Sequence, residues 1–220
     1  MRVLGSEWPT LVAELDSWLN ASLLTVTKSS GIEPDSAMGD VAVGRLGNLP
    51  SFTLRTGVAE ATGLPDGDVD GIAVGTAFHW FEPRSTADEF RRILRPNGWV
   101  ALVGNERIEI SETDHAFSKL LARFRGNAHK SMRPLAACEP EKFLGSNTKH
   151  ERFHYEFKMS ESSFKSLAFS RSYFPESNSP QRKLAEVAVA ETFCHHAVEG
   201  VLVLNYEVTA FAAQPFDSHA

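Results

Sequence analysis

The segment 65–103 constrains the fold more than any other, because two apolar runs in it flank an amphipathic helix pattern. Pro65-Asp66-Gly67-Asp68 predicts a turn leading into Val69 to Val74, a nearly continuous apolar run typical of a strand buried on both faces. A helix is expected over 84–94 and should end at Arg95-Pro96-Asn97-Gly98, where the glycine tolerates a left-handed conformation. Trp99 to Val103 predicts the next buried strand. This alternation predicts an α/β fold whose two apolar strands are adjacent and parallel.

The remaining patterns extend this architecture through a single domain covering residues 1–220. Helices are expected at about 10–20, 35–46, 114–124, 160–168 and 180–196, and strands at about 31–34, 52–54, 153–157 and 201–212. We expect the helix at 35–46 to be capped by Asp35 or Ser36, and the one after 160 by Ser160. Residues 1–30 form an atypical N-terminal segment. Residues 126–150 are expected to be an irregular surface excursion or lid.

Composition excludes several classes of protein. A net charge of −6 disfavours a nucleic-acid partner, since nucleic-acid-binding proteins usually have a basic face. The two cysteines, Cys138 and Cys194, cannot build a disulfide framework, which favours reduced thiols and a cytoplasmic location. We find no signal-peptide pattern and no apolar run long enough to span a bilayer, so no membrane partner is expected. Cys194-His195-His196 does not predict a metal site, because adjacent helix residues point in different directions.

Several short segments together resemble one enzyme family. The order and spacing of these pieces are similar to class I S-adenosylmethionine (SAM)-dependent methyltransferases of the type 11 group, although each piece alone is common. The matching pieces are Gly31-Ile32-Glu33-Pro34, Ala59-Glu60, Ala77-Phe78-His79-Trp80-Phe81, Arg91 to Gly98, Val103 to Arg107, Ser170 to Pro175 and Asn205 to Thr209. The resemblance implies a Rossmann-like methyltransferase fold, mainly a parallel sheet with an antiparallel C-terminal edge strand, and SAM as cofactor.

The resemblance also implies roles for residues at the carboxyl ends of the strands, where open α/β sheets bind ligands. It implies that Glu33 accepts hydrogen bonds from both ribose hydroxyls and that the Ala59-Glu60 loop meets the adenine. Thr76 is a further cofactor-binding candidate. His79 and Trp80 are the catalytic candidates and would line the acceptor pocket, with His79 as a base or a hydrogen-bond donor; a packed core histidine is the alternative.

A second group of residues is a candidate for binding an anionic methyl acceptor. Asn105, Arg107, Arg171 and Tyr173 are polar or aromatic, and arginine binds carboxylates in a bidentate way. Ordinary solvated surface residues are the alternative. Asn127 and His129 could face the acceptor by position alone. A carboxylate acceptor needs no base, whereas a hydroxyl or an amine needs one, so His79 does not decide the substrate.

The chain departs from the family at its N-terminus. No Gly-x-Gly-x-Gly loop precedes Glu33, where only Gly5 and Gly31 occur, so the family's first strand is missing or replaced. Leu23 to Thr27 cannot be a parallel neighbour of Gly31 to Glu33, because such strands need a crossover of about a dozen residues. The two segments are one long strand or a hairpin, or the former is not a strand. We expect weak or lost SAM binding, and a homo-oligomer that covers the exposed sheet edge.

Two functions of different classes follow from these observations. The first is SAM-dependent methyl transfer to a small molecule, for example a carboxylic acid as in trans-aconitate methyltransferases. The alternative is a non-catalytic methyltransferase-like protein that has lost SAM binding and acts through protein interaction. A truncated gene product is a third reading. A NAD-dependent oxidoreductase is disfavoured, since that class also needs a glycine-rich first turn.

Overall fold

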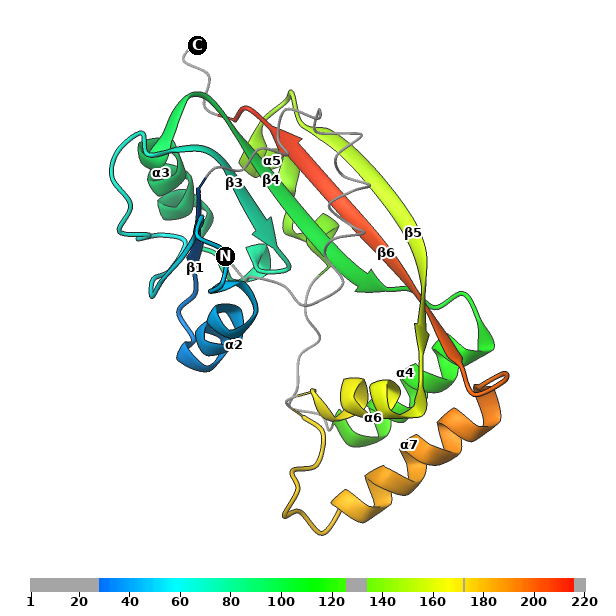
Figure 1. Cartoon of the computed structure of the whole chain (residues 1–220). Coiled ribbons are helices and arrows are strands. Elements are labelled where there is room, and N and C mark those ends of the chain that lie inside the picture. The colour runs from blue at the N-terminus through cyan, green and yellow to red at the C-terminus, as the bar shows by residue number, and fades with distance from the viewer. Residues whose placement is uncertain (1–27, 126–133, 172, 216–220) are drawn as a thin grey trace. The chain divides into compact units, whose positions relative to one another are not determined.

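The computed structural model describes residues 28–125, 134–171 and 173–215. The elements in chain order are β1 (Ser29–Ile32), α2 (Ser36–Leu46), β2 (Phe52–Arg55), β3 (Val69–Gly75), α3 (Pro83–Ile93), β4 (Leu94–Arg107), α4 (Glu112–Arg125), α5 (Pro140–Leu144), β5 (Lys149–Met159), α6 (Glu161–Phe169), α7 (Arg182–His196) and β6 (Leu202–Ala213), with 3₁₀ turns at Phe78–Trp80 and Leu135–Cys138 (Figure 1). The expected helix at 10–20, the segment 23–27, Asn127 and His129 lie outside the described residues.

The described strands form an α/β fold with two sheets. β1 and β2 are parallel and make a two-stranded sheet, and the other four strands follow the order β3-β4-β6-β5. β3 and β4 are parallel, with Ile72 opposite Val100 and Val74 opposite Leu102, which confirms the predicted adjacency of the two apolar strands. β6 runs opposite to its neighbours β4 and β5 (Figure 1). The fold is therefore Rossmann-like, with a mostly parallel, mixed sheet.

The two sheets are separate within the described part of the chain. β1 pairs only with β2, and β3 pairs only with β4 among the residues that the structure describes. Ile32 of β1 nevertheless belongs to the same hydrophobic cluster as Ile72 and Val74 of β3. An uncovered strand edge favours association, and the homo-oligomer stays a prediction.

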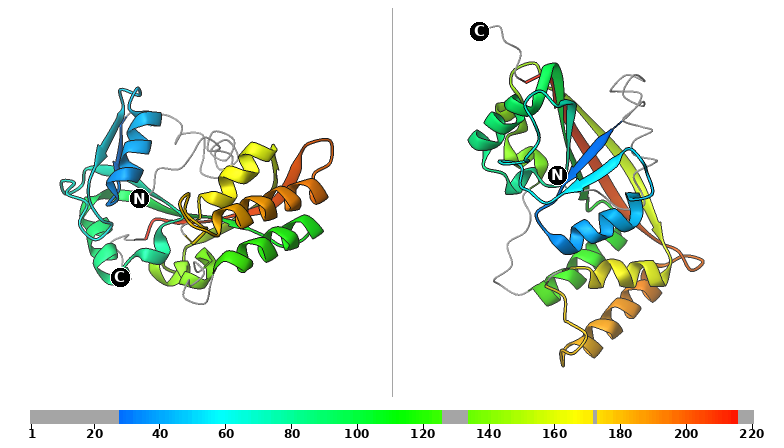
Figure 2. Two further views of the ribbon diagram at one scale, coloured as in Figure 1. Left: turned by 90° about the horizontal axis from the view of Figure 1, so that it is seen from below. Right: turned by 60° about the vertical axis from the view of Figure 1, so that its left-hand side comes forward.

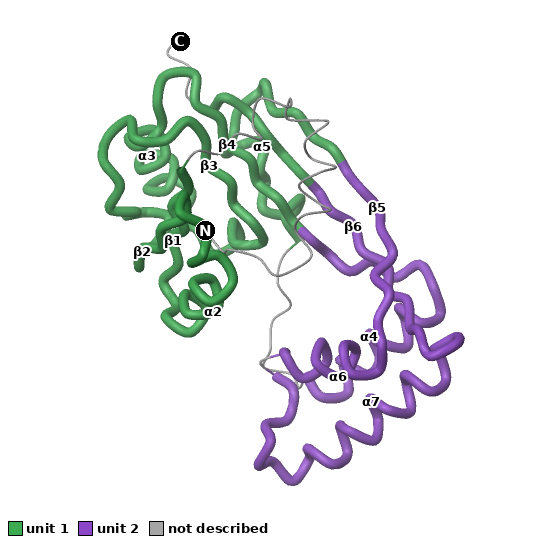
Figure 3. The backbone as a smooth tube through the Cα atoms, viewed as in Figure 1, with its two compact units in different colours: residues 1–104, 134–151, 210–220 green, residues 105–133, 152–209 purple. Residues whose placement is uncertain are grey.

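The chain divides into two compact units (Figure 3). Unit 1 comprises the described residues within 1–104, 134–151 and 210–220, and unit 2 those within 105–133 and 152–209. Each has its own core. That of unit 1 includes Val74, Phe90 and Leu102, and that of unit 2 includes Phe117 and Phe164. β4, β5 and β6 each contribute residues to both units. A division into two units that share strands does not decide the number of domains, so the single domain remains a prediction.

Helix caps occur where the sequence predicts them. The Asp35 side chain accepts a hydrogen bond from Met38 N at the start of α2, and Ser160 accepts one from Ser163 N at the start of α6. Within unit 1, α2 packs against β2 (Figure 2). A Cβ on Gly39 would lie 3.1 Å from Cδ2 of Leu54, so a small residue allows this close approach. The Asp35 cap and the packing of α2 on β2 together fix the loop that follows β1.

The end of α3 differs from the prediction in one detail. The helix ends at Ile93, and Asn97 rather than Gly98 takes the left-handed conformation, with φ of 62°. Asparagine tolerates this region because its short polar side chain can hydrogen-bond locally. Gly98 is needed for a different reason, since a Cβ there would lie 2.7 Å from Cδ2 of Leu94.

The stretch predicted to be irregular contains regular structure. α5 occupies Pro140–Leu144, and β5 begins at Lys149. Pro140 is well suited to the first helical turn, where its missing N–H is not needed. Leu144 is 2% exposed and Phe143 packs against the same core cluster, so burial of apolar side chains stabilises this short helix. The irregular prediction was therefore wrong for residues 140–144 and 149–150.

Candidate functional site

The carboxyl ends of β1, β2 and β3 come together in unit 1. Glu33 N donates to the carbonyl of Arg55, which joins the end of β1 to the end of β2. Ile32, Ala59, Ala77 and Phe78 belong to one buried cluster. The loops that follow these strands therefore share one core. The candidates from these loops are Glu33, Ala59, Glu60, Thr76, His79 and Trp80, here called the strand-end site.

Glu33 is a buried carboxylate. The residue is 7% exposed, and its Oε1 accepts a hydrogen bond of 3.1 Å from Asp35 N. Within the described residues the Glu33 carboxylate has no other hydrogen bond and no cationic partner. An ionised carboxylate can accept about four hydrogen bonds. Buried carboxylates are almost always paired. The Glu33 carboxylate accepts one hydrogen bond within the protein, so it has capacity left for donors from a ligand.

The loop that contains Ala59 and Glu60 follows β2 and is hydrogen-bonded to the start of α3. Ala59 is buried, and Glu60 Oε1 accepts hydrogen bonds from Glu82 N at 2.8 Å and Thr86 Oγ1 at 3.4 Å. Glu60 therefore satisfies a backbone donor at the N-terminus of α3, where a negative charge is stabilised. Contact of this loop with adenine stays a prediction.

A second carboxylate, that of Glu89 in the C-terminal half of α3, holds the same loop. Glu89 accepts hydrogen bonds from Thr62 N at 2.8 Å and Thr62 Oγ1 at 2.5 Å, and from Arg92 Nε at 2.9 Å and Nη2 at 2.8 Å. The hydrogen bonds from Arg92, opposed by burial and helped by those from Thr62, lower the pKa of Glu89 from 4.5 to about 2. Sequence reasoning missed this cluster, although Glu89 and Arg92 have the i, i+3 spacing of a helical ion pair.

The segment after β3 is strained and aromatic. Thr76 has φ of 48°, a left-handed conformation that is rare for a β-branched residue, and its N–H donates to Val103 O at 2.7 Å. Such strain is frequent at ligand sites. The rings of His79 and Trp80 are 4.8 Å apart; His79 is partly buried, whereas Trp80 is 71% exposed. Trp80 is therefore available to a ligand rather than part of the core.

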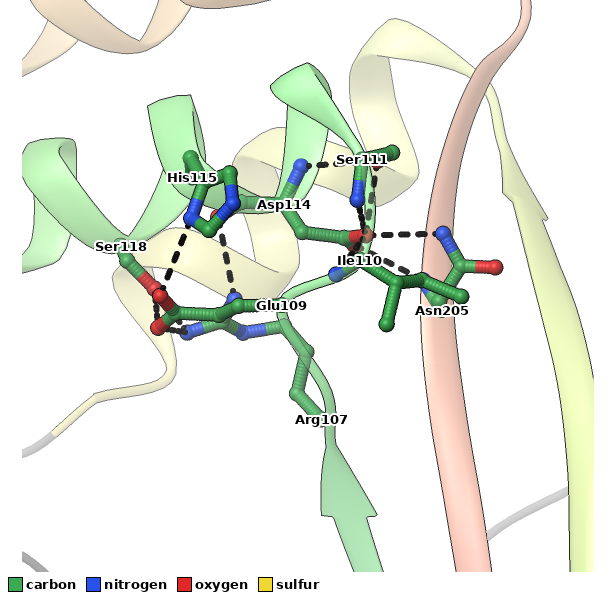
Figure 4. A network of polar contacts seen from close by, with 8 residues as sticks. All are labelled: Arg107, Glu109, Ile110, Ser111, Asp114, His115, Ser118 and Asn205. Carbon is green, nitrogen blue, oxygen red and sulfur yellow. Dashed lines mark hydrogen bonds and ion pairs between the residues drawn. The ribbon is translucent and has the colours of Figure 1, made fainter.

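In unit 2, Arg107 is held by α4 (Figure 4). Its Nη1 donates to the carbonyl of Asp114 at 3.1 Å, and its Nη2 donates to Ser118 Oγ at 2.6 Å. The guanidinium also lies 5.2 Å from the centre of the Phe117 ring. Two of its five N–H donors are therefore used within the protein, which gives Arg107 a structural role, and its predicted role in binding the acceptor stays a prediction.

Asp114 connects α4 to β6 and is fully buried (Figure 4). Its carboxylate accepts hydrogen bonds from Ile110 N, Ser111 N, Ser111 Oγ, Asn205 N and Asn205 Nδ2. Burial raises the pKa of Asp114, but the hydrogen bonds from Asn205 and Ser111 outweigh burial, and the pKa is lowered overall. Sequence reasoning missed this role, although Ser111 and Asp114 have the spacing of a capping box.

The other acceptor candidates lie in the same unit. Asn105 is exposed, and its Oδ1 accepts a hydrogen bond of 3.2 Å from Tyr155 Oη. Arg171 follows α6 and is partly buried. The ring of Tyr173 packs edge-on against that of Phe174, with centroids 6.4 Å apart.

The described residues contain no group of three or more His, Cys, Asp or Glu side chains arranged to hold a metal ion. No described helix is both long and apolar enough to cross a membrane.

The known proteins that this chain is similar to are described as methyltransferases. A family model described as a methyltransferase domain matches residues 16–102. An uncharacterized methyltransferase of Schizosaccharomyces pombe is 39% identical over 78 residues, which are 36% of this chain and 31% of that protein. One of Mycobacterium tuberculosis is 41% identical over 61 residues, which are 28% of this chain and 25% of that protein. The matched region thus spans about a third of these relatives or less.

Solved structures extend the likeness over most of the fold. A protein from Anaeromyxobacter dehalogenans, proposed to be a type II methyltransferase, is 20% identical with a TM-score of 0.61 and covers 87% of this chain and 82% of its own. One from Bacillus halodurans, also proposed to be a methyltransferase, is 16% identical with a TM-score of 0.50 and covers 86% and 84%. These structures share the fold of this chain, and the family model that it matches describes a methyltransferase domain.

Proposed function

We propose that this chain is a SAM-dependent methyltransferase that acts on a small molecule. The observation that supports this most strongly is Glu33, a buried carboxylate with spare acceptor capacity at the carboxyl end of β1. An open α/β sheet binds its ligand at this edge. A ribose offers two neighbouring hydroxyl donors, and these match the two oxygens of one carboxylate.

The other residues of the strand-end site fit the same cofactor. Ala59 and Glu60 would border the adenine, and Thr76 would lie close to the bound molecule at the strained end of β3. SAM supplies a methyl group that is already activated for transfer when it is bound. The protein then has to align the acceptor and exclude water, which is the main catalytic contribution in such reactions.

The acceptor would lie next to His79 and Trp80. An exposed indole offers an apolar face to an incoming molecule, and the adjacent imidazole offers a donor or an acceptor. We include carboxylic acids among the proposed acceptors, because a carboxylate is ionised at neutral pH and needs no base. A hydroxyl or amine acceptor would require His79 as the base.

A second candidate function is a non-catalytic protein of the same fold. Two observations favour it. No Gly-x-Gly-x-Gly sequence precedes Glu33 to approach the methionine half of SAM, and the Glu60 carboxylate already accepts a hydrogen bond from Glu82 N at the start of α3. This protein would have lost SAM binding and would act through contacts with other proteins.

Calorimetric titration of SAM into the full chain distinguishes the two candidates. We expect weak, saturable binding to the wild type, and a loss of about tenfold or more in Glu33→Ala, since each charge-assisted hydrogen bond contributes about 1.5–3 kcal/mol. Asp40→Ala is the matched control, because Asp40 is an exposed carboxylate on the neighbouring helix α2.

Each possible outcome has a definite meaning. Unchanged binding in Glu33→Ala would show that the cofactor site is elsewhere. Absence of binding to a wild type whose circular dichroism is that of a folded protein would favour the non-catalytic candidate. Equal losses in Glu33→Ala and Asp40→Ala would indicate a general effect of removing negative charge.

A further inference from the structure

Unit 2 contains a guanidinium that is not fully satisfied. The Nε atom of Arg171 is buried and has no hydrogen-bond partner within the described ranges. Arg171 also has no ion pair with a described residue. A buried donor without a partner is costly, particularly on a charged group. Such groups in folded proteins therefore require an explanation, and a bound ligand is one.

Arg171 interacts electrostatically with a buried phenol, that of Tyr206. Tyr206 is 8% exposed, and its ring stacks on that of Tyr155, with centroids 5.6 Å apart and an interplanar angle of 22°. Phe157 packs against the same ring edge-on at 6.0 Å. Tyr155 in turn donates its hydroxyl to Oδ1 of Asn105, which leaves the amide NH₂ of Asn105 as a donor. Arg171, Tyr206 and Asn105 thus place several donors in one neighbourhood.

Two arginines act electrostatically on Tyr206. Burial raises the pKa of Tyr206, and the positive charges of Arg171 and then of Arg107 oppose this rise, whereas Tyr155 and Asp114 add to it. Arg107 and Asp114 are already engaged, because the former donates to the carbonyl of the latter and to Ser118. Arg171 is the cation of this group that lacks a compensating partner among the described residues.

We propose that Arg171, with Tyr206 and Asn105 as neighbouring donors, binds the oxyanion group of a small molecule. The planar guanidinium matches a carboxylate or a phosphate through two parallel hydrogen bonds. One bound anion would satisfy the buried donor and neutralise the charge of Arg171. The proposal rests on unit 2 alone, and its test requires no SAM, so its failure is distinguishable from failure of the proposed function.

The first experiment measures thermal unfolding of the full chain with defined anions. The probes are benzoate, succinate and inorganic phosphate at millimolar concentration, compared with the neutral analogues benzamide and succinamide and with sodium chloride at equal ionic strength. We expect saturable stabilisation by at least one anion and none by the neutral analogues, since a ligand that binds the native state raises its stability. Stabilisation by benzoate or succinate identifies a carboxylate site, and stabilisation by phosphate alone identifies a phosphate site.

Two variants then locate the site. Arg171→Met should weaken anion binding about tenfold or more, since charge-assisted hydrogen bonds are lost. It should leave the anion-free protein at least as stable as the wild type, because an unsatisfied buried donor is removed. Tyr206→Phe should keep the fold and weaken the binding of the same anion.

The control is Arg182→Met in the same unit. Arg182 is satisfied, with Nε on Glu186 at 2.9 Å, Nη1 on the carbonyl of Pro175 at 3.2 Å, and its guanidinium over the Phe169 ring at 3.5 Å. Its replacement should lower stability without changing anion binding. The proposal is overturned if no anion stabilises the wild type, if Arg171→Met destabilises the anion-free protein as Arg182→Met does, or if anion binding survives in Arg171→Met.

Discussion

Replacing Glu89 by glutamine tests the link between α3 and the loop after β2. Glu89 is 9% exposed and receives hydrogen bonds from Thr62 and Arg92. Glutamine keeps the size of the side chain but removes its charge and turns an NH₂ group toward donors. The fall in pKa from 4.5 to about 2 corresponds to about 3 kcal/mol of stability at neutral pH. We expect a loss of about 2–3 kcal/mol in Glu89→Gln, since glutamine retains part of the hydrogen bonding.

The assay is urea unfolding at pH 7, followed by circular dichroism. A loss of this size should move the unfolding midpoint down by about 1 M. Asp88→Asn is the control, because it removes a carboxylate one position away that pairs with Arg91 on the exposed surface. Exposed ion pairs contribute about 0–1 kcal/mol, so the control should stay close to the wild type.

The pH dependence gives a second, independent check. A carboxylate whose folded pKa is depressed stabilises the protein fully above its unfolded value, here about 4.5, and loses that contribution as pH falls through about 2. The difference between the wild type and Glu89→Gln should therefore be constant above pH 5 or so and shrink toward pH 2. The reasoning is refuted if Glu89→Gln and Asp88→Asn behave alike at pH 7, or if the deficit is independent of pH.

Two further substitutions test other features of the fold. Asp114→Asn should cost about 2–3 kcal/mol at pH 7, because buried donors of Ser111 and Asn205 lose their anion, and the deficit should shrink as pH falls below 3.8, the ordinary pKa of this carboxyl; equal midpoints in urea would contradict this role. Gly71→Ala should cost about 1–3 kcal/mol, because the added Cβ would lie 2.0 Å from Cε2 of Trp99 on the paired strand and the indole must move; an unchanged near-ultraviolet circular dichroism spectrum would show that the indole had not moved.

The elements that could be predicted from the sequence are those with a strong local signal. β3 and the buried part of β4 were predicted because strands covered on both faces are continuously apolar. The caps at Asp35 and Ser160 were predicted because these side chains satisfy backbone donors within the same turn. α5 was missed because a helix of five residues is too short to show helical periodicity, and its stability comes from burial of Leu144.

The contacts that organise the candidate sites lie beyond local patterns. Thr62 and Glu89 are 27 residues apart, and Asp114 and Asn205 are 91 apart, so no spacing in the sequence links them. Arg107 was predicted from its residue type to bind the acceptor, which stays a prediction, whereas its contacts with Asp114 and Ser118 were not predicted. Tyr206 was not a candidate, since a tyrosine in an apolar strand is indistinguishable from a core residue before its neighbours are known.

The position of β6 has a consequence for how this chain folds during synthesis. Leu202, Leu204 and Tyr206 belong to the core of unit 2, whereas Phe211 belongs to that of unit 1. A nascent chain that has not yet reached Leu202 therefore lacks part of both cores, and β4 lacks one of its two strand neighbours. Contacts between residues so distant along the chain form slowly, and partly folded chains expose apolar surface until these contacts have formed. Folding should thus be completed only after translation of β6, and dependence on chaperones should be concentrated in that interval.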